Sequence, residues 1–426
     1  MPTTDRRRAV LTGLGVLSPI GSTPAAFWDA LVTGTRGVKR IQAFDPSALS
    51  CQVAGEIPGF VAKNDIDKSY RKEIKAMGRT VQLGLVASKY AMDDAGLSKG
   101  SVKPERFGVD FASVTGTTEL DDLASAGQKT ADPVARSVDM PKWGQEALGE
   151  IPPLWMLKYL PNMPACHVTI LFDAQGPSNT IISSEAAGVL VFGEALRIIR
   201  RDAADFMLVG GSENKIHPLS LARYAAFMNM TKQTADPGAA IRPFDRDRDG
   251  TALGEGGCVF GLEELEHAQK RGAKIYGEVV GFASGIDRGL TGNGLARVIR
   301  HAMADAGIQE GDVDHVNAHG SGEVELDAFE ARGIGAVFGT RVPVFAPLSR
   351  FGNLGAASGV IELAASVLAL QHGQLPPTLN CEHPDPACPI AVHTSGMRPV
   401  TKPYVVKTSY TDLGQCAVMV VRKWSE

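Results

Sequence analysis

Short apolar runs alternate along this chain with longer stretches in which apolar residues recur at helical spacing. Ala9–Leu14 and Asp205–Gly210 are typical of buried strands, and Thr80–Ala95 is typical of an amphipathic helix. This alternation favours an α/β protein. The same patterns predict further strands at Arg106–Ser113, Thr180–Ser184, Gly256–Leu262, Ile275–Ala283, His315–Ala318, Val342–Ala346 and Tyr404–Ser409, and helices at Ala186–Arg200, Gly294–Ala306, Glu325–Phe338 and Ala356–Gln371.

The chain has 426 residues, which is enough for two ordinary domains. A helical stretch followed by a strand near Glu266–Lys274 predicts a division into residues 1–266 and 267–426. Both parts begin with a strand that ends in a turn of small residues, which is a weak sign of duplication. A segment at about 115–165 is rich in proline, tryptophan and charge. We interpret it as an excursion from the core that serves as a lid or a dimer contact.

Charge and cysteine usage narrow the class of protein. The net charge of −4 gives no electrostatic case for nucleic acid binding. The six cysteines are scattered without a CxxC pair, which suits a reducing cytoplasm better than a disulfide framework. The apolar run that follows the basic first residues is broken by glycine and proline, so we expect no membrane span.

Cofactor and metal motifs are weak in this chain. The glycine-rich turns match neither the P-loop nor the dinucleotide pattern, so no cofactor is predicted. Cys381, His383, Cys388 and His393 lie close together, but their spacing fits no common zinc site. We therefore predict no metal centre.

Four extended motifs carry a resemblance to a known family. They are VLTGLGVLSPIG near the start, LPNMPACHVTILFDAQGPS (Leu160–Ser178), RPFDRDRDGTALGEGGCVFGLEELEHAQKRGAKIYGEVVGF (Arg242–Phe282) and LPPTLNCEHPDPAC (Leu375–Cys388). Together they resemble the β-ketoacyl synthase branch of the thiolase-fold proteins, with Leu160–Ser178 similar to its dimer-interface strand and the Gly-Pro before the nucleophile. The resemblance implies a five-layered αβαβα fold of two similar halves, usually a dimer, and decarboxylative Claisen condensation on acyl groups carried by acyl carrier protein.

The nucleophile turn departs from the family pattern. The family has Gly-Pro, seven residues and then cysteine at a helix start, whereas here Gly176-Pro177 is followed by Ser178–Ser184 and Glu185. A carboxylate attacks a thioester poorly, and the product would be a high-energy mixed anhydride. One interpretation is an acid stabilised by the helix dipole. The other is a site residue that fills the position of the acyl-enzyme.

The resemblance places two hydrogen-bond donors beside that position. His319, in VNAHGSGEVELDAFE, matches the first histidine motif. The second motif, Lys-Ser-x-x-Gly-His, reads Leu348-Ser-Arg-Phe-Gly-Asn353, so leucine replaces the lysine and asparagine replaces the histidine. Asn353 can still donate through its amide. A cradle of His319 and Asn353 is therefore possible, although weakened by the loss of the lysine.

Two further positions also depart from the family. Glu323 stands at a threonine-like position. The late Gly-Phe-Gly-Gly loop is replaced by Tyr410-Thr-Asp-Leu-Gly414, which removes the aromatic gate. Changes concentrated in one pocket, on a retained scaffold, indicate loss or redirection of condensation. Chain-length factors of type II polyketide systems, which lack the cysteine and pair with an active ketosynthase, show a similar pattern.

Three functional hypotheses follow. The first, which we prefer, is a chain-length-factor-like subunit that forms a heterodimer with an active ketosynthase; otherwise the chain is a homodimer. The second is a malonyl-carrier-protein decarboxylase that uses His319 and Asn353, and the third is an atypical 3-oxoacyl-carrier-protein synthase. Acyl carrier protein is the expected partner in each case. Two basic stretches are candidate docking sites for this carrier: one is Arg197, Arg200 and Arg201, and the other is Arg71, Lys72, Lys75 and Arg79. The alternative for the three arginines at 197–201 is that they stabilise the C-terminus of a helix.

Overall fold

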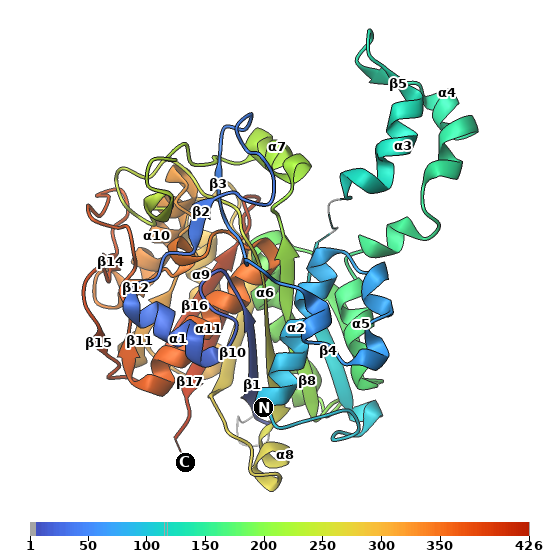
Figure 1. The fold of residues 1–426 in the computed structure, drawn as a ribbon. Helices are drawn as coiled ribbons and strands as arrows, with labels where there is room; N and C mark the ends of the chain where they lie inside the picture. The colour runs from blue at the N-terminus through green and yellow to red at the C-terminus, as the bar shows by residue number, and fades with distance from the viewer. Residues whose placement is uncertain (1–5, 115, 117, 426) are drawn as a thin grey trace.

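The structure is a computed structural model and describes residues 6–114, 116 and 118–425. Within these residues one eleven-stranded sheet has the order β14-β12-β11-β16-β17-β10-β1-β9-β8-β4-β7 (Figure 1). Its strands are β1 (Ala9–Leu17), β4 (Phe107–Ala112), β7 (Ser178–Ile181), β8 (Phe206–Asn214), β9 (Glu255–Glu264), β10 (Gly277–Ile286), β11 (Val313–Asn317), β12 (Pro343–Phe345), β14 (Ala391–Val392), β16 (Tyr404–Tyr410) and β17 (Gln415–Lys423).

The sheet consists of two halves with the same topology. In one half the order is β7-β4-β8-β9-β1, and in the other it is β12-β11-β16-β17-β10, so both follow the chain order 3-2-4-5-1. In both halves the fifth strand runs antiparallel to its two neighbours, the first and the fourth. The second strand runs parallel to its two neighbours, the fourth and the third. The halves meet where β1 and β10 pair over three residues.

The first strand of each half contains a glycine at an equivalent bulge. The register shifts between Leu11 and Gly13 in β1 and between Val279 and Gly281 in β10. A Cβ at Gly13 would lie 2.3 Å from the Ala91 oxygen, and a Cβ at Gly281 would lie 2.3 Å from an alanine oxygen of the equivalent helix in the other half. Only glycine lets the strand and helix approach this closely. The prediction of a fold made of two similar halves is confirmed.

Helices cover both faces of each half and form the five layers. The central layer is α6 (Ala187–Arg200) and α11 (Ser358–His372), which contact each other and strands of both halves. From Ser358 to Leu370 every residue of α11 is buried, as expected for a helix enclosed by sheets. The outer layers are α2 (Arg79–Asp94) with α5 (Met163–Phe172), and α9 (Asn293–Ala306) with α10 (Val324–Phe338), on opposite sides of the molecule (Figure 1).

The predicted excursion forms an arm that stands away from the body (Figure 1). It contains α3 (Leu120–Thr130), the hairpin β5 (Ala131–Asp132) and β6 (Ser137–Val138), and α4 (Met140–Lys142). At its base, Lys158 Nζ lies 2.9 Å from an oxygen of Asp122. Its exposed apolar side chains include Leu120, Val134, Val138, Met140, Leu148, Leu154 and Met156. Residues 115 and 117, at the start of the predicted excursion, lie outside the described residues.

The structure differs from the predicted elements in the segment before Glu185. Most of Leu160–Ser178 is the helix α5, with Pro164 in its first turn, where a missing N–H costs nothing. The strand β7 ends at Ile181, earlier than the predicted end at Ser184. The strand β17 was not predicted. The remaining elements are α1 (Pro24–Thr33), α7 (Pro218–Phe227), α8 (Leu265–Lys270), β2 (Val38–Arg40), β3 (Val53–Gly55), β13 (Gln374–Leu375) and β15 (Arg398–Pro399).

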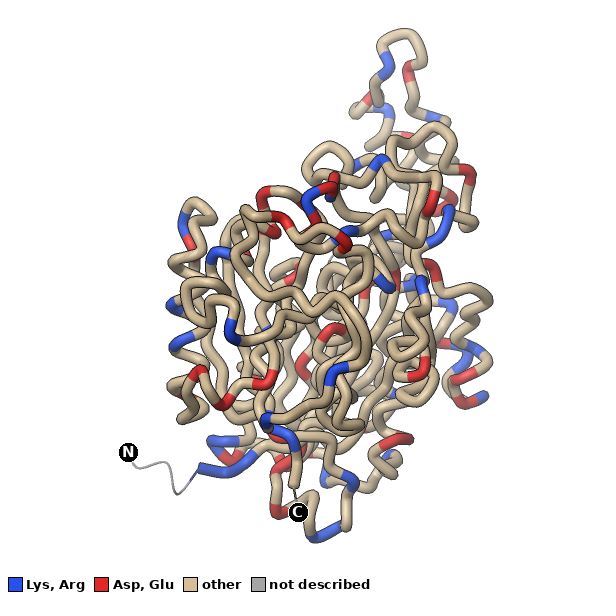
Figure 2. Tube along the Cα trace, turned by 90° about the vertical axis from the view of Figure 1, so that its left-hand side faces the viewer, with Lys and Arg blue, Asp and Glu red and all other residues tan. Residues whose placement is uncertain are grey.

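Across the described residues, the helices and the charged surface both agree with a chain that lacks a long apolar segment and carries charges of both signs (Figure 2). Among the described residues, no helix has both the length and the apolar character needed to cross a membrane. Figure 2 shows Lys and Arg interspersed with Asp and Glu over the face in view.

Candidate functional site

Glu185 lies at the start of α6, in the turn that follows β7. A 3-10 turn over Ser184–Ala186 leads directly into the helix. Ser184 has a φ of 41°, in the left-handed region that residues other than glycine rarely adopt. Ser409 Oγ on β16 donates to the Glu185 carbonyl oxygen at 2.7 Å, so the turn is held by the other half of the protein. The backbone thus fixes where the Glu185 side chain begins.

Two donors hold one oxygen of the Glu185 carboxylate. Lys215 Nζ lies 3.2 Å from Oε1, and Asn353 Nδ2 donates to the same oxygen at 3.3 Å. Burial by itself raises the pKa of this carboxyl, but the positive charge of Lys215, assisted by His319, brings the pKa below its ordinary value. Glu185 is therefore ionised at neutral pH.

Lys215 is a site residue that the sequence did not reveal. Its side chain is only 3% exposed, and Nζ lies 4.0 Å from Glu213 and 4.5 Å from the centre of the Tyr224 ring. Burial lowers the pKa of Lys215, yet Glu213 and Glu185 together raise it above its ordinary value, so the ammonium keeps its charge. The order of the strands is a signal that could have located Lys215. β7 and β8 both run parallel to β4, so the residues that follow them, including Glu185 and Lys215, lie at the same sheet edge.

His319 follows β11 and lies in a buried network of charged groups. Its Nδ1 is 2.9 Å from Glu362 Oε1, and Lys407 Nζ is 2.5 Å from the other oxygen of Glu362. The backbone N–H of His319 donates to Glu330 Oε1 at 2.9 Å. Burial lowers the pKa of His319, but the Glu362 carboxylate outweighs this effect and raises it. Glu362 fixes both the orientation and the proton affinity of this ring.

The structure brings Asn353 into the site but not Leu348. Asn353 Oδ1 accepts from Gly355 N at 2.8 Å, which turns Nδ2 toward Glu185. Leu348 is fully buried in the apolar core and does not line the cavity. An ammonium group nevertheless lies behind His319, supplied by Lys407 of β16. A lysine inside a predicted buried strand was a signal for this, because a buried charge needs a partner.

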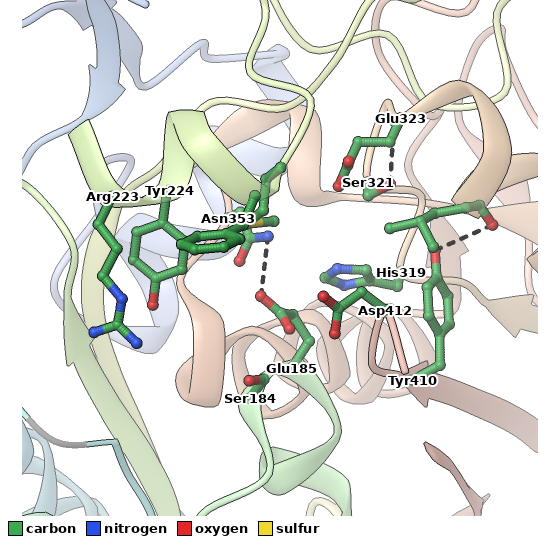
Figure 3. Close-up of a pocket in the computed structure, with 13 residues that line it drawn as sticks. Ser184, Glu185, Arg223, Tyr224, His319, Ser321, Glu323, Asn353, Tyr410 and Asp412 are labelled. Carbon is green, nitrogen blue, oxygen red and sulfur yellow. Dashed lines mark hydrogen bonds between the residues drawn. The ribbon is translucent and has the colours of Figure 1, made fainter. Parts of the chain in front are cut away.

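Glu185, His319 and Asn353 border a cavity of about 180 Å³ (Figure 3). It extends from Glu185 and His319 to Glu323, and to Asp412 in the late loop. The Tyr410 ring packs edge-on against His319, with centroids 5.5 Å apart. The other lining residues are Ser184, Arg223, Tyr224, Phe227, Met228, Ser321, Leu326 and Asn353.

The cysteines lie elsewhere in the fold. Cys51, Cys258, Cys381, Cys388 and Cys416 are buried, and Cys166 is half-buried on α5. Burial raises the pKa of the Cys381 and Cys388 thiols to about 12. Among the described residues, no group of His, Cys, Asp and Glu side chains is arranged to hold a metal ion. Neither a thiolate nor a metal centre therefore borders the cavity in the described part of the chain.

The sequence matches models of a known protein family over most of its length. A model of the β-ketoacyl synthase N-terminal domain matches residues 6–268, and a model of its C-terminal domain matches residues 276–382. The chain belongs to the β-ketoacyl synthase family. Two curated β-ketoacyl synthases illustrate its similarity to both fatty acid and polyketide enzymes. The 3-oxoacyl-[acyl-carrier-protein] synthase 2 of Synechocystis is 35% identical over 402 residues, or 91% of each chain. A putative polyketide β-ketoacyl synthase 1 of Streptomyces halstedii is 37% identical over 392 residues, or 90% of each chain.

Solved structures of β-ketoacyl synthases superpose along the whole chain. The ishigamide ketosynthase/chain length factor has a TM-score of 0.86 and 28% identity, and covers 99% of this chain and 100% of its own. A ketosynthase bound to a hexaketide, in complex with a type II acyl-carrier protein, has a TM-score of 0.84 and 28% identity, with the same coverage. The predicted thiolase-like fold is thereby confirmed.

Proposed function

We propose that this chain is a non-condensing, chain-length-factor-like partner of an active ketosynthase in type II fatty acid or polyketide synthesis. Glu185 stands where the family has its nucleophilic cysteine. The observation that carries the proposal is the pairing of its carboxylate with Lys215 and Asn353, and the charge of Lys215 lowers the pKa of this carboxyl. Such a group gains nothing by attacking a thioester, because the product would be a mixed anhydride and the contact with Lys215 would be lost.

The absence of an alternative thiol supports this proposal. In the described part of the chain no cysteine lines the cavity, and burial raises the pKa of the Cys258 and Cys416 thiols above the ordinary value. Neither group is a thiolate at neutral pH. A condensing enzyme of the usual kind would need a thiol, and the described residues that line the cavity include none.

The decarboxylase alternative is less well supported by the geometry. It requires Asn353 Nδ2 to polarise a malonyl thioester, but Glu185 already accepts that donor. It also requires Glu185 to be neutral or turned away, whereas Glu185 is ionised and lines the cavity. Glu323 and Asp412 add two more carboxyl groups around the space that a malonyl carboxylate would enter. The Glu185 carboxylate, and any of these groups that is ionised, repels the malonyl carboxylate and opposes its binding.

An open sheet edge supports pairing with a second subunit. β7 is the last strand of the sheet, and its outer edge pairs with no strand in the described residues. Ile182, just after β7, and Ile170 on α5 are 59% and 57% exposed. An unpaired edge flanked by apolar side chains is a ready template for another chain. The arm projects beyond the body with its own apolar side chains and offers further area to the same partner (Figure 1).

Acyl carrier protein is the second proposed partner, and the cytoplasm is the proposed compartment. Of the two basic stretches, Arg79 pairs with Glu255 and Arg200 pairs with Asp305. Those two guanidinium groups are therefore committed within the chain. Lys72 and Lys75 are exposed and remain suitable for an acidic carrier.

Coexpression with a cysteine-bearing ketosynthase tests the proposal. We expect a stable one-to-one heterodimer, condensation by the pair, and no condensation by this chain alone. Replacing the partner's cysteine by alanine should abolish condensation, whereas Glu185→Ala in this chain should leave acyl transfer to the partner intact. Condensation by this chain alone would contradict the proposal.

A further inference from the structure

The cavity beside Glu185 contains a buried carboxylate with an unused oxygen. Glu323 is 4% exposed, and its Oε2 accepts from Asn229 N at 3.1 Å. Its Oε1 is buried without a hydrogen-bond partner among the described residues. A buried carboxylate oxygen left unpaired costs free energy, so the position favours a ligand that brings a donor.

Glu323 and Glu185 lie on opposite sides of the cavity (Figure 3). Lys215 and Asn353 both contact the Glu185 carboxylate at Oε1. Asp412 lines the same space from the late loop. Among the described lining residues, Arg223 is the one with a permanent positive charge, and it lies on the exposed face of α7.

The remaining walls are aromatic and apolar. Tyr224, Phe227 and Tyr410 present rings to the cavity, together with Met228 and Leu326. Aromatic faces and carboxylates together attract alkylammonium groups, and a volume of about 180 Å³ accommodates a short aliphatic chain.

We propose that this cavity binds a primary ammonium group on a short aliphatic chain, with Glu323 as the main recognition residue. Glu323 Oε1 accepts from the ammonium, and Asp412 and the carboxylate of Glu185, which also pairs with Lys215, line the same space. This inference rests on the proposed function only because it assumes that the cavity no longer binds malonyl thioesters. It concerns ligand binding by the isolated chain, so amine binding can fail while assembly with the partner succeeds, and assembly can fail while amine binding succeeds.

Calorimetric titration of the full chain with n-pentylamine, 1-pentanol and pentanoate tests the proposal. We expect n-pentylamine to bind at least tenfold more tightly than 1-pentanol, and pentanoate not to bind. Glu323→Gln should remove the preference for the amine, whereas the matched control Glu325→Gln, at an exposed position of α10, should keep it. Equal binding of amine and alcohol, or an unchanged preference in Glu323→Gln, would overturn the proposal.

A second measurement needs no variant. Burial raises the pKa of Glu323 to about 7, and the nearby Glu185 and Asp327 carboxyls add to this effect, while Asn229 N and His319 oppose it. Alkylamines stay cationic throughout this range, so amine affinity should rise by about tenfold between pH 6 and pH 8 as Glu323 ionises. Affinity that stays constant or falls over that range would also overturn the proposal.

Discussion

Lys215 Nζ lies 3.2 Å from Glu185 Oε1, and the two side chains are 3% and 12% exposed. The Lys215 ammonium lies between two buried carboxyl groups, those of Glu185 and Glu213. Its positive charge lowers the pKa of Glu185, so the acid at position 185 is an ion. Under the function proposed above, this ion pair is the reason that the family scaffold is retained without covalent capture of an acyl group.

Lys215→Met should destabilise the protein strongly, because it leaves Glu185 and Glu213 buried without their cation. We expect a loss of about 3–5 kcal/mol in the free energy of unfolding, measured by urea denaturation. The double variant Lys215→Met/Glu185→Gln should recover part of this loss. A loss of less than 1 kcal/mol would show that the ammonium does not stabilise Glu185.

Glu185→Gln should reveal latent chemistry of the His319–Asn353 cradle. Removing the charge frees Asn353 Nδ2 and reduces the repulsion of a malonyl carboxylate. We expect release of carbon dioxide from malonyl-carrier protein to be undetectable for the natural chain and measurable for Glu185→Gln. Glu185→Gln/His319→Ala should return to the background rate. Decarboxylation by the natural chain that disappears in His319→Ala would instead favour the decarboxylase hypothesis.

Glu323→Gln should stabilise the protein in a pH-dependent way. The pKa of this carboxyl is raised to about 7 in the folded state, against about 4.3 unfolded. Its ionisation therefore costs nothing below pH 4 and reaches its full cost above pH 7, at most about 4 kcal/mol. The free energy of unfolding of Glu323→Gln should exceed that of the natural chain by an amount that grows from pH 5 to pH 8. A difference that shrinks over this range would be inconsistent with a raised pKa.

Ile182→Asp should weaken assembly with the partner ketosynthase and leave the fold unchanged. Ile182 is 59% exposed beside the open edge of β7, so a charge there opposes burial in an interface without disturbing the core. Analytical ultracentrifugation should show dissociation at concentrations where the natural pair stays intact. Val32→Asp on α1, at a 43% exposed position in another part of the fold, is the control and should assemble normally.

Much of the fold could be predicted from sequence, because apolar runs and apolar residues at helical spacing report burial directly. The strand β1 is predicted from its apolar run and the helix α2 from its helical spacing, and the resemblance carried by the long motifs implies the five layers. The helix α5 was not predicted because its apolar residues are spread around the helix and do not recur on one face. Glu185, His319 and Asn353 could be placed by motif and do lie together.

The partners of these residues could not be predicted in the same way. Lys215 follows β8 at the sheet edge where β7 also ends, and Lys407 on β16 contacts Glu362 on α11. The sequence signals that such residues need partners, but only the packing of the elements shows that Glu185 and Glu362 are those partners. The orphan oxygen of Glu323 likewise depends on three-dimensional packing.

Intact-protein mass spectrometry of the heterodimer after exposure to an acyl-carrier thioester is the most direct test of whether this chain captures substrate. We predict an acyl mass increment on the cysteine-bearing partner and none on this chain, with the same result after Glu185→Gln. An acyl adduct on this chain that forms from the thioester and passes on to product would contradict the assignment of Glu185 as a non-nucleophilic ion.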